Sequence, residues 1–114
     1  MKTVNVTQAN TLSLDNICTV FNERSSNDTD DIGNPVTQKT DIKKLFCAER
    51  SVHSNEFYKA KQSGIQPEKE IIVDTESYGA QRYAEYGGTV YRIYRTYPRA
   101  DGLTELYLTT EVGR

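Results

Sequence analysis

The C-terminal third of the chain alternates in a way that permits little besides a β-hairpin. Successive side chains of residues 90–97 would fall on opposite faces of a strand, as the period of two requires. A second alternating run covers residues 105–110. Pro98 ends the first run because it has no N–H for a ladder hydrogen bond, and Asp101 and Gly102 form a turn signal between the runs. We therefore predict an antiparallel hairpin, with Tyr91, Ile93, Arg95 and Tyr97 on one face.

The chain offers little material for a hydrophobic core. Leu, Ile, Val and Phe make up 24 of its 114 residues, which suits one small domain. Eight tyrosines add apolar area, although each hydroxyl needs water or a partner. Two interpretations remain open: a modest core with one solvated sheet face, or further burial by neighbouring subunits.

The N-terminal half predicts two strands around a polar stretch. Residues 1–10 lack periodicity and are expected to form an arm or an added strand, whereas residues 11–114 form the domain. Alternation over residues 17–21 indicates one strand, and residues 45–48 indicate its return. Residues 22–40 between them are rich in Ser, Asn, Asp, Gly and Pro. They predict a long polar loop or an extended hairpin tip.

One short helix interrupts the strands. Ser54 is placed as its N-cap and Gly64 as its C-terminal stop, which gives a helix too short to be stable alone in water. Short strands follow at residues 70–74 and 82–86, and Gly87-Gly88 suits a two-residue hairpin loop. The fold class is therefore mainly β: a small β-barrel or sandwich of five to six short strands, one short helix and a long polar loop.

Charge is unevenly distributed along the chain. The net charge is −2, which argues against a dedicated nucleic-acid binder. Residues 22–41 carry a local charge of −3, whereas residues 82–99 carry +3. The two regions either meet head to tail between copies of the chain or are separate solvated patches.

Catalytic and cofactor chemistry has no evident place in the sequence. His53 is the single histidine and lacks a recognisable partner, so neither a nucleophilic triad nor a metal site is nominated. Cys18 and Cys47 are expected to be buried free thiols rather than a disulfide. An acidic run at residues 28–33 fails the calcium-loop pattern, because Lys39 occupies the twelfth position. No enzyme activity, metal or cofactor is expected.

Neither secretion nor membrane insertion is indicated, since an apolar leader and a long apolar run are absent.

The interleaved tyrosines and arginines of residues 91–99 admit three interpretations. Aromatic and Arg side chains on a sheet can stack single-stranded nucleic acid, and they are also enriched at protein interfaces. Cross-strand pairing within the fold would explain them equally well. The acidic net charge favours a protein partner over nucleic acid.

Three segments resemble the head-closure proteins of long-tailed bacteriophages, also called head-tail joining or stopper proteins. They are SNEFYKAKQSGIQPE at residues 54–68, YGGTVYRIYRTY at residues 86–97 and DGLTELYLTTEVG at residues 101–113. The resemblance covers about the C-terminal half of the chain. It implies a small β-barrel that assembles as a ring of copies below the portal and adaptor proteins.

The resemblance also implies a role without catalysis. Such a ring closes the DNA-filled head by steric blocking, offers a platform for tail-completion or tail proteins, and belongs to the virion neck after assembly in the host cytoplasm. By position, two segments are candidates for closure: residues 54–67 and the acidic loop of residues 22–40. The candidate residues of the first are Ser54, Asn55, Glu56, Phe57, Tyr58, Lys59 and Gly64. The candidate contacts with other subunits or partners are Asp28, Asp30, Asp31, Arg92, Tyr94, Arg95 and Tyr97. The alternatives are another neck component, such as an adaptor or tail-completion protein, and an oligonucleotide-binding barrel.

Overall fold

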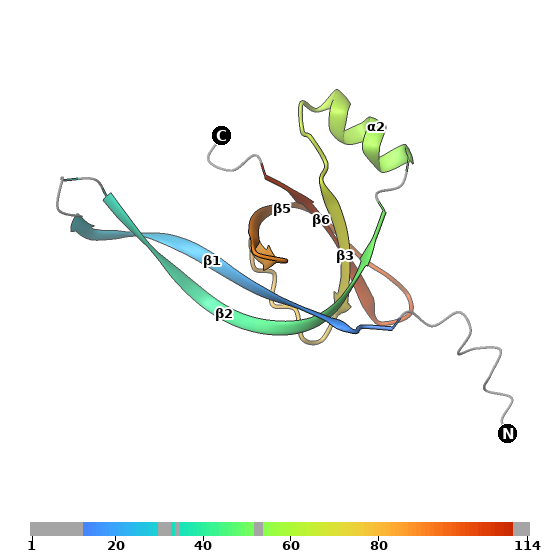
Figure 1. Cartoon of the computed structure of the whole chain (residues 1–114), viewed down its shortest axis with the longest axis horizontal. Coiled ribbons are helices and arrows are strands. Elements are labelled where there is room, and N and C mark those ends of the chain that lie inside the picture. The colour runs from blue at the N-terminus through green and yellow to red at the C-terminus, as the bar shows by residue number, and fades with distance from the viewer. Residues whose placement is uncertain (1–12, 30–32, 34, 52–53, 111–114) are drawn as a thin grey trace, which may run out of the picture.

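The computed structural model describes residues 13–29, 33, 35–51 and 54–110, and it confirms the mainly β fold. The predicted N-terminal arm, residues 1–10, lies outside the described residues. The elements are β1 (Asn16–Thr29), β2 (Pro35–Arg50), α2 (Ser54–Gln62), β3 (Lys69–Asp74), β4 (Tyr83–Tyr86), β5 (Thr89–Pro98) and β6 (Leu103–Thr109) (Figure 1). Every strand pairing is antiparallel.

The strands close into a small barrel in the order β1-β2-β3-β6-β5-β4. Strand β1 completes the closure, because it pairs with β2 on one side and with β4 on the other. The pairing with β4 is short: only Thr19, Val20 and Phe21 take part. Closure therefore involves only a few residues near the middle of β1.

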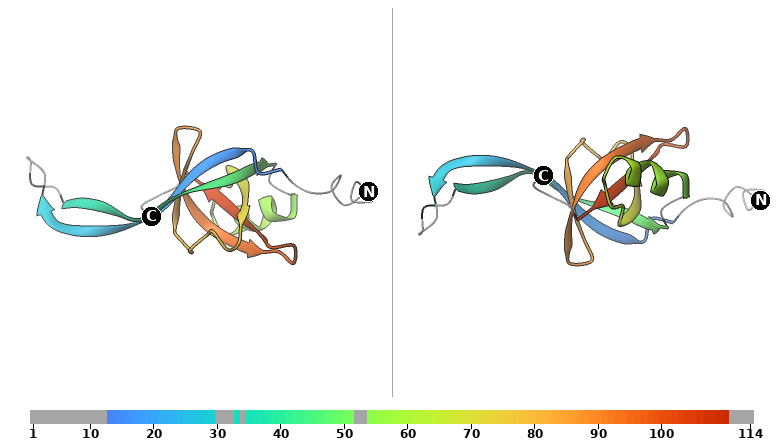
Figure 2. Two further views of the ribbon diagram at one scale, coloured as in Figure 1. Left: turned by 90° about the horizontal axis from the view of Figure 1, so that it is seen from below. Right: turned by 90° about the horizontal axis from the view of Figure 1, so that it is seen from above.

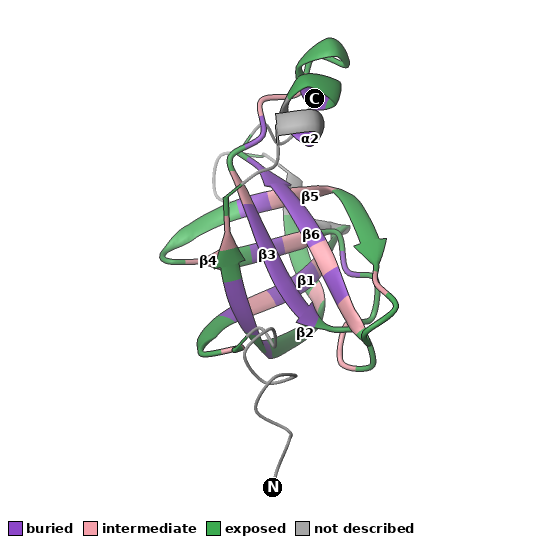
Figure 3. Ribbon diagram, turned by 90° about the vertical axis from the view of Figure 1, so that its right-hand side faces the viewer, coloured by how far each residue is buried: buried purple, intermediate pink, exposed green. Residues whose placement is uncertain are grey.

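The hydrophobic core fills the barrel from the inward faces of all six strands. Figure 3 shows the buried stretches of β3 and β6 crossing the barrel. Period-two geometry explains which strand residues are buried, since every second residue of each strand points inward. The core comprises Cys18, Val20, Leu45, Cys47, Ile71, Val73, Ala84, Tyr91, Leu106 and Leu108. The two cysteines are free and buried, as predicted.

The predicted long polar loop is wrong for most of its length. Residues 22–29 continue β1 and residues 35–40 begin β2, so the alternative of an extended hairpin tip is confirmed. β1 has 14 residues and β2 has 16, longer than the short strands expected. Polar residues can form this ribbon because the paired backbones satisfy each other's hydrogen bonds without a core.

The predicted C-terminal hairpin is confirmed, but its face assignment holds only in part. β5 pairs with β6, and Leu106 and Leu108 point into the core. A register shift between Ile93 and Arg95 inserts an extra residue into β5. Tyr91 and Ile93 therefore face the core, whereas Arg95 and Tyr97 are exposed, because a β-bulge interrupts the alternation.

Truncation of one core residue should destabilise the barrel. Leu106 is completely buried, so Leu106→Ala should lower the free energy of unfolding by about 2–5 kcal/mol through lost burial and a cavity. Ile17 is 56% exposed, and Ile17→Ala should change it by no more than about 0.5 kcal/mol. Urea denaturation followed by circular dichroism measures both variants. Equal effects would contradict the assigned core.

Candidate assembly surfaces

Helix α2 begins and ends where the sequence predicts. It starts at Ser54, and Gly64 adopts a φ of 81° just beyond its end. The Gly64 N–H donates to the Lys61 carbonyl at 3.0 Å, and the Ile65 N–H donates to the Ala60 carbonyl at 2.8 Å. This pair of bonds is a Schellman cap, which explains why a glycine stops the helix at this position.

A small polar contact attaches α2 to the outside of β5. The Tyr94 hydroxyl donates to Glu56 Oε2 at 2.9 Å, and Arg95 Nε lies 3.4 Å from Glu56 Oε1. Glu56 is buried although it is on a helix surface, so its carboxylate needs both partners. Burial and the bond to Glu56 raise the pKa of Tyr94, which keeps its hydroxyl a donor. We call Glu56, Tyr94 and Arg95 the helix latch.

The latch borders a row of charged and aromatic side chains across the outer face of β2, β3 and β6. Glu70 is completely buried there, with Arg50 Nη1 3.8 Å from its Oε2. The same Arg50 nitrogen lies 3.8 Å from Glu105 Oε2, and the Tyr107 hydroxyl donates to Glu105 Oε1. The Arg50 guanidinium thus offsets the charge of the buried Glu70 carboxylate and connects it to Glu105 across the three strands.

The ribbon of residues 22–29 and 35–40, which we call the arm, leaves the barrel beyond Phe21. Figures 1 and 2 show it projecting from one end of the molecule, with α2 toward the other. Phe21 is buried at this point, stacked on Tyr83 at 5.6 Å between ring centroids. Lys39 Nζ lies 4.6 Å from the Phe21 ring, a cation–π contact that covers the aromatic pair.

Side-chain hydrogen bonds hold the base of the arm. An extra residue in β2 forms a bulge there, and Asp41 adopts a φ of 53°. Asn22 Nδ2 donates to Asp41 Oδ2 at 2.9 Å, and Gln81 Nε2 donates to the Asp41 carbonyl at 2.9 Å. The Arg82 N–H donates to Asn22 Oδ1 at 2.9 Å. We call Asn22, Asp41 and Gln81 the arm root, since together they set the direction in which the arm leaves.

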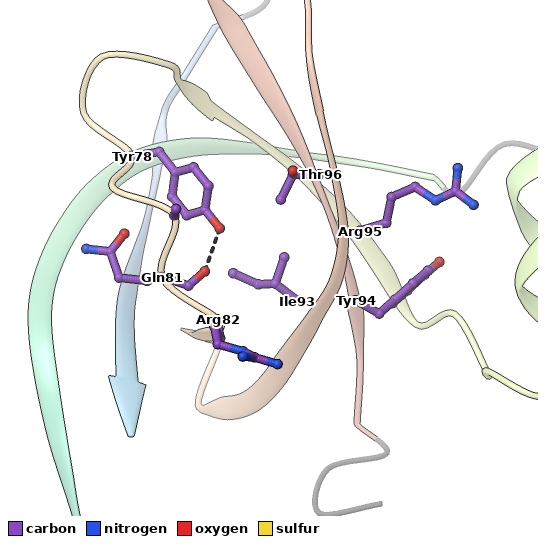
Figure 4. Close-up of a pocket in the computed structure, with 8 residues that line it drawn as sticks. Tyr78, Gln81, Arg82, Ile93, Tyr94, Arg95 and Thr96 are labelled. Atoms are coloured by element: carbon purple, nitrogen blue, oxygen red, sulfur yellow. Dashed lines mark hydrogen bonds between the residues drawn. The ribbon is translucent and has the colours of Figure 1, made fainter. Parts of the chain in front are cut away.

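A pocket of about 260 Å³ opens beside β5, close to the arm root (Figure 4). The loop between β3 and β4 forms one wall of the pocket. In this loop Ala80 has a φ of 64°, and the Tyr78 hydroxyl donates to the Gln81 carbonyl. Burial raises the pKa of Tyr78 to about 12, so the hydroxyl remains a donor. The other wall is β5 itself, from Ile93 to Thr96.

The structure describes four members of the predicted closure segment fully. Glu56 is in the latch, Tyr58 and Lys59 are exposed on the helix, and Gly64 lies in its C-terminal cap. The side chains of Ser54, Asn55 and Phe57 lie outside the described part of the chain. Glu56 thus attaches the segment to the barrel, while Tyr58 faces solvent.

The predicted contact residues fall into separate groups. Tyr94 and Arg95 bind Glu56 within the chain, whereas Tyr97 is 58% exposed. Arg92 is half-buried and pairs in register with Tyr83. Asp30, Asp31 and the side chain of Asp28 lie outside the described residues, although Asp28 belongs to β1.

Sequence reasoning missed the arm root and the pocket. Asn22, Asp41 and Gln81 are far apart in the chain and follow no shared motif. Their contacts depend on a bulge and on backbone angles at Asp41 and Ala80 that residue type alone does not indicate. The break in alternation after Phe21 was the one available signal.

Removal of the Glu56 carboxylate should release α2 while the barrel remains folded. Glu56→Ala should raise amide hydrogen exchange across residues 54–62 about tenfold, since a hydrogen bond to a charged group contributes about 1.5–3 kcal/mol. Lys59→Ala, at an exposed position of the same helix, is the matched control. Equal exchange in both variants and the native chain would show that Glu56 does not hold the helix.

Among the residues that the structure describes, no three His, Cys, Asp or Glu side chains form a group that could hold a metal ion. No helix within the described ranges is long and apolar enough to cross a membrane.

No protein-family model matches the chain, and no curated protein matches it either. Its function must therefore be inferred from its own residues and their arrangement.

Proposed function

We propose that this chain is a structural component of the neck of a tailed bacteriophage. Copies of it form a ring below the portal and adaptor proteins, close the DNA-filled head and provide a platform for the tail. The observation that carries this proposal is the convergence of the three phage-like segments. Glu56 in the first contacts Tyr94 and Arg95 in the second, and the second pairs with the third as β5 and β6.

The attachment of α2 supports a role in closure. A helix of nine residues is marginal in water by itself, so its position depends on the latch and on a few neighbouring bonds. Two of these bonds join the segment after the helix to β6: the Thr109 hydroxyl donates to the Gln66 carbonyl at 2.8 Å, and the Glu68 N–H donates to the Leu108 carbonyl at 2.9 Å. None of the described helix residues belongs to the core cluster, so a change in the position of the helix would leave that cluster intact, as a segment that blocks DNA by steric means would require.

The charge arrangement supports contacts with proteins rather than with nucleic acid. Arg95 pairs with Glu56, and Arg99 lies 2.9 Å from Asp101 and 3.8 Å from Glu105. Carboxylates thus offset part of the positive charge of residues 95–99, which disfavours the oligonucleotide-binding alternative. Tyr58 and Tyr97 are exposed aromatics of the kind enriched at protein interfaces, and they suit contacts with other copies or neck proteins.

Binding to a neck assembly tests this proposal. Purified chain should join isolated portal–adaptor rings of its own phage and add a density ring below them in electron microscopy. Tyr97→Ser should weaken this binding, whereas Thr110→Ser, at an exposed position after β6, should not. A chain that ignores these rings but shifts single-stranded DNA in a salt-dependent way would contradict the neck role and favour the oligonucleotide-binding alternative.

A further inference from the structure

Half of β5 has an open edge. β5 pairs with β4 only from Thr89 to Arg92, and the last backbone bond on that side joins the Ile93 N–H to the Arg82 carbonyl at 2.8 Å. Beyond it, residues 95–98 pair with β6 alone among the residues that the structure describes. Such an edge presents backbone donors and acceptors that can pair with another extended segment.

The open edge suits a short segment with negative charge. The bulge near Tyr94 and the proline at its far end limit it to about four residues, which excludes pairing along a long strand. The pocket lies alongside and provides space for side chains of an added segment. Arg82 lines this pocket and is exposed, and its backbone is fixed by bonds to Asn22 and Ile93. Arg95 is already paired with Glu56, so Arg82 is the cation best placed to receive a carboxylate.

The arm together with its turn has the charge of such a segment. By sequence, residues 22–41 carry five carboxylates against two cations, and three of the five, Asp28, Asp30 and Asp31, lie close together in the chain. Eight residues of β1 beyond Phe21 span roughly 25 Å, enough to reach past the barrel to a neighbouring molecule. A two-stranded ribbon is at best marginally stable in water, so the arm would gain stability from a surface that covers it.

We propose that the arm of one copy docks along the open β5 edge of a second copy, where Arg82 attracts the net negative charge of residues 22–41. This inference rests on the proposed ring function and identifies the surfaces that join adjacent subunits. The donating and receiving surfaces differ, so the contact is head to tail and can repeat from copy to copy until a ring closes. Gln81 lines the receiving pocket and also bonds to Asp41 of the arm root, so the arm leaves each barrel beside the site that receives the next arm.

Charge reversal on the two surfaces tests this contact. Arg82→Glu, and separately the triple change Asp28→Lys, Asp30→Lys and Asp31→Lys, should each weaken self-association roughly tenfold or more, because like charges would then face each other. One chain that carries both sets of changes should recover self-association. A mixture of the two single-surface variants should also recover association, in assemblies that alternate the two chains, because each arm then meets an edge of opposite charge on the other variant. Sedimentation velocity over a range of concentrations measures each case.

Lys44→Glu is the matched control, because Lys44 is an exposed cation on β2 outside both surfaces. An equal loss in this control, or no recovery in the combined variant, would overturn the docking inference. A wild-type chain that stays monomeric alone and in the ring-binding experiment would overturn it as well. If the chain still binds portal–adaptor rings while the charge reversals have no effect, only the docking inference fails. If it self-associates as described but ignores those rings, only the neck function fails.

Discussion

The division of β1 between two roles determines the shape of this protein. Its first half closes the barrel, because Thr19, Val20 and Phe21 pair with β4 as well as with β2. Its second half has β2 as its only strand partner among the described residues and leaves as the arm. The change occurs at Phe21, where stacking on Tyr83 ends the closed part and the Asp41 bulge redirects β2. Hydrogen bonds from Asn22 and Gln81 then fix the direction of the arm.

The outer surface of the barrel is organised unevenly as a result. One side carries the buried Glu70 and the latch to α2, and its charges are largely compensated within the chain. The β1–β2 side exposes Ile17 and Phe46, which are partners in the β1–β2 register. The helix is attached through the latch and its buried Ala60, and the arm is a continuation of β1 and β2 whose direction three side chains set. The core cluster contains no described residue of either. This combination suits a protein that completes its structure by joining others.

Local sequence patterns predicted the features of this fold that depend on residues close together in the chain. Alternation located β5 and β6, and Gly64 located the end of α2. The sequence does not distinguish a loop from a hairpin for the arm, because the arm pairs two polar strands that carry no hydrophobic signal. The bulge at Tyr94 and the ion pair between Arg95 and Glu56 depend on tertiary contacts. The sequence therefore could not show which residues of β5 face the core, or which of the predicted contact residues bind within the chain instead. The pocket beside Gln81 follows from backbone angles that residue type does not fix.

The most direct measurement is the oligomeric state of a chain in which residues 24–38 are replaced by a two-residue Asn-Gly turn. The barrel core lies outside this segment, so the variant should keep its circular dichroism spectrum and its cooperative unfolding. If the arm joins adjacent copies, native mass spectrometry should find assemblies of the intact chain and only monomers of the shortened one. Assemblies of the same size from both chains would contradict that role for the arm.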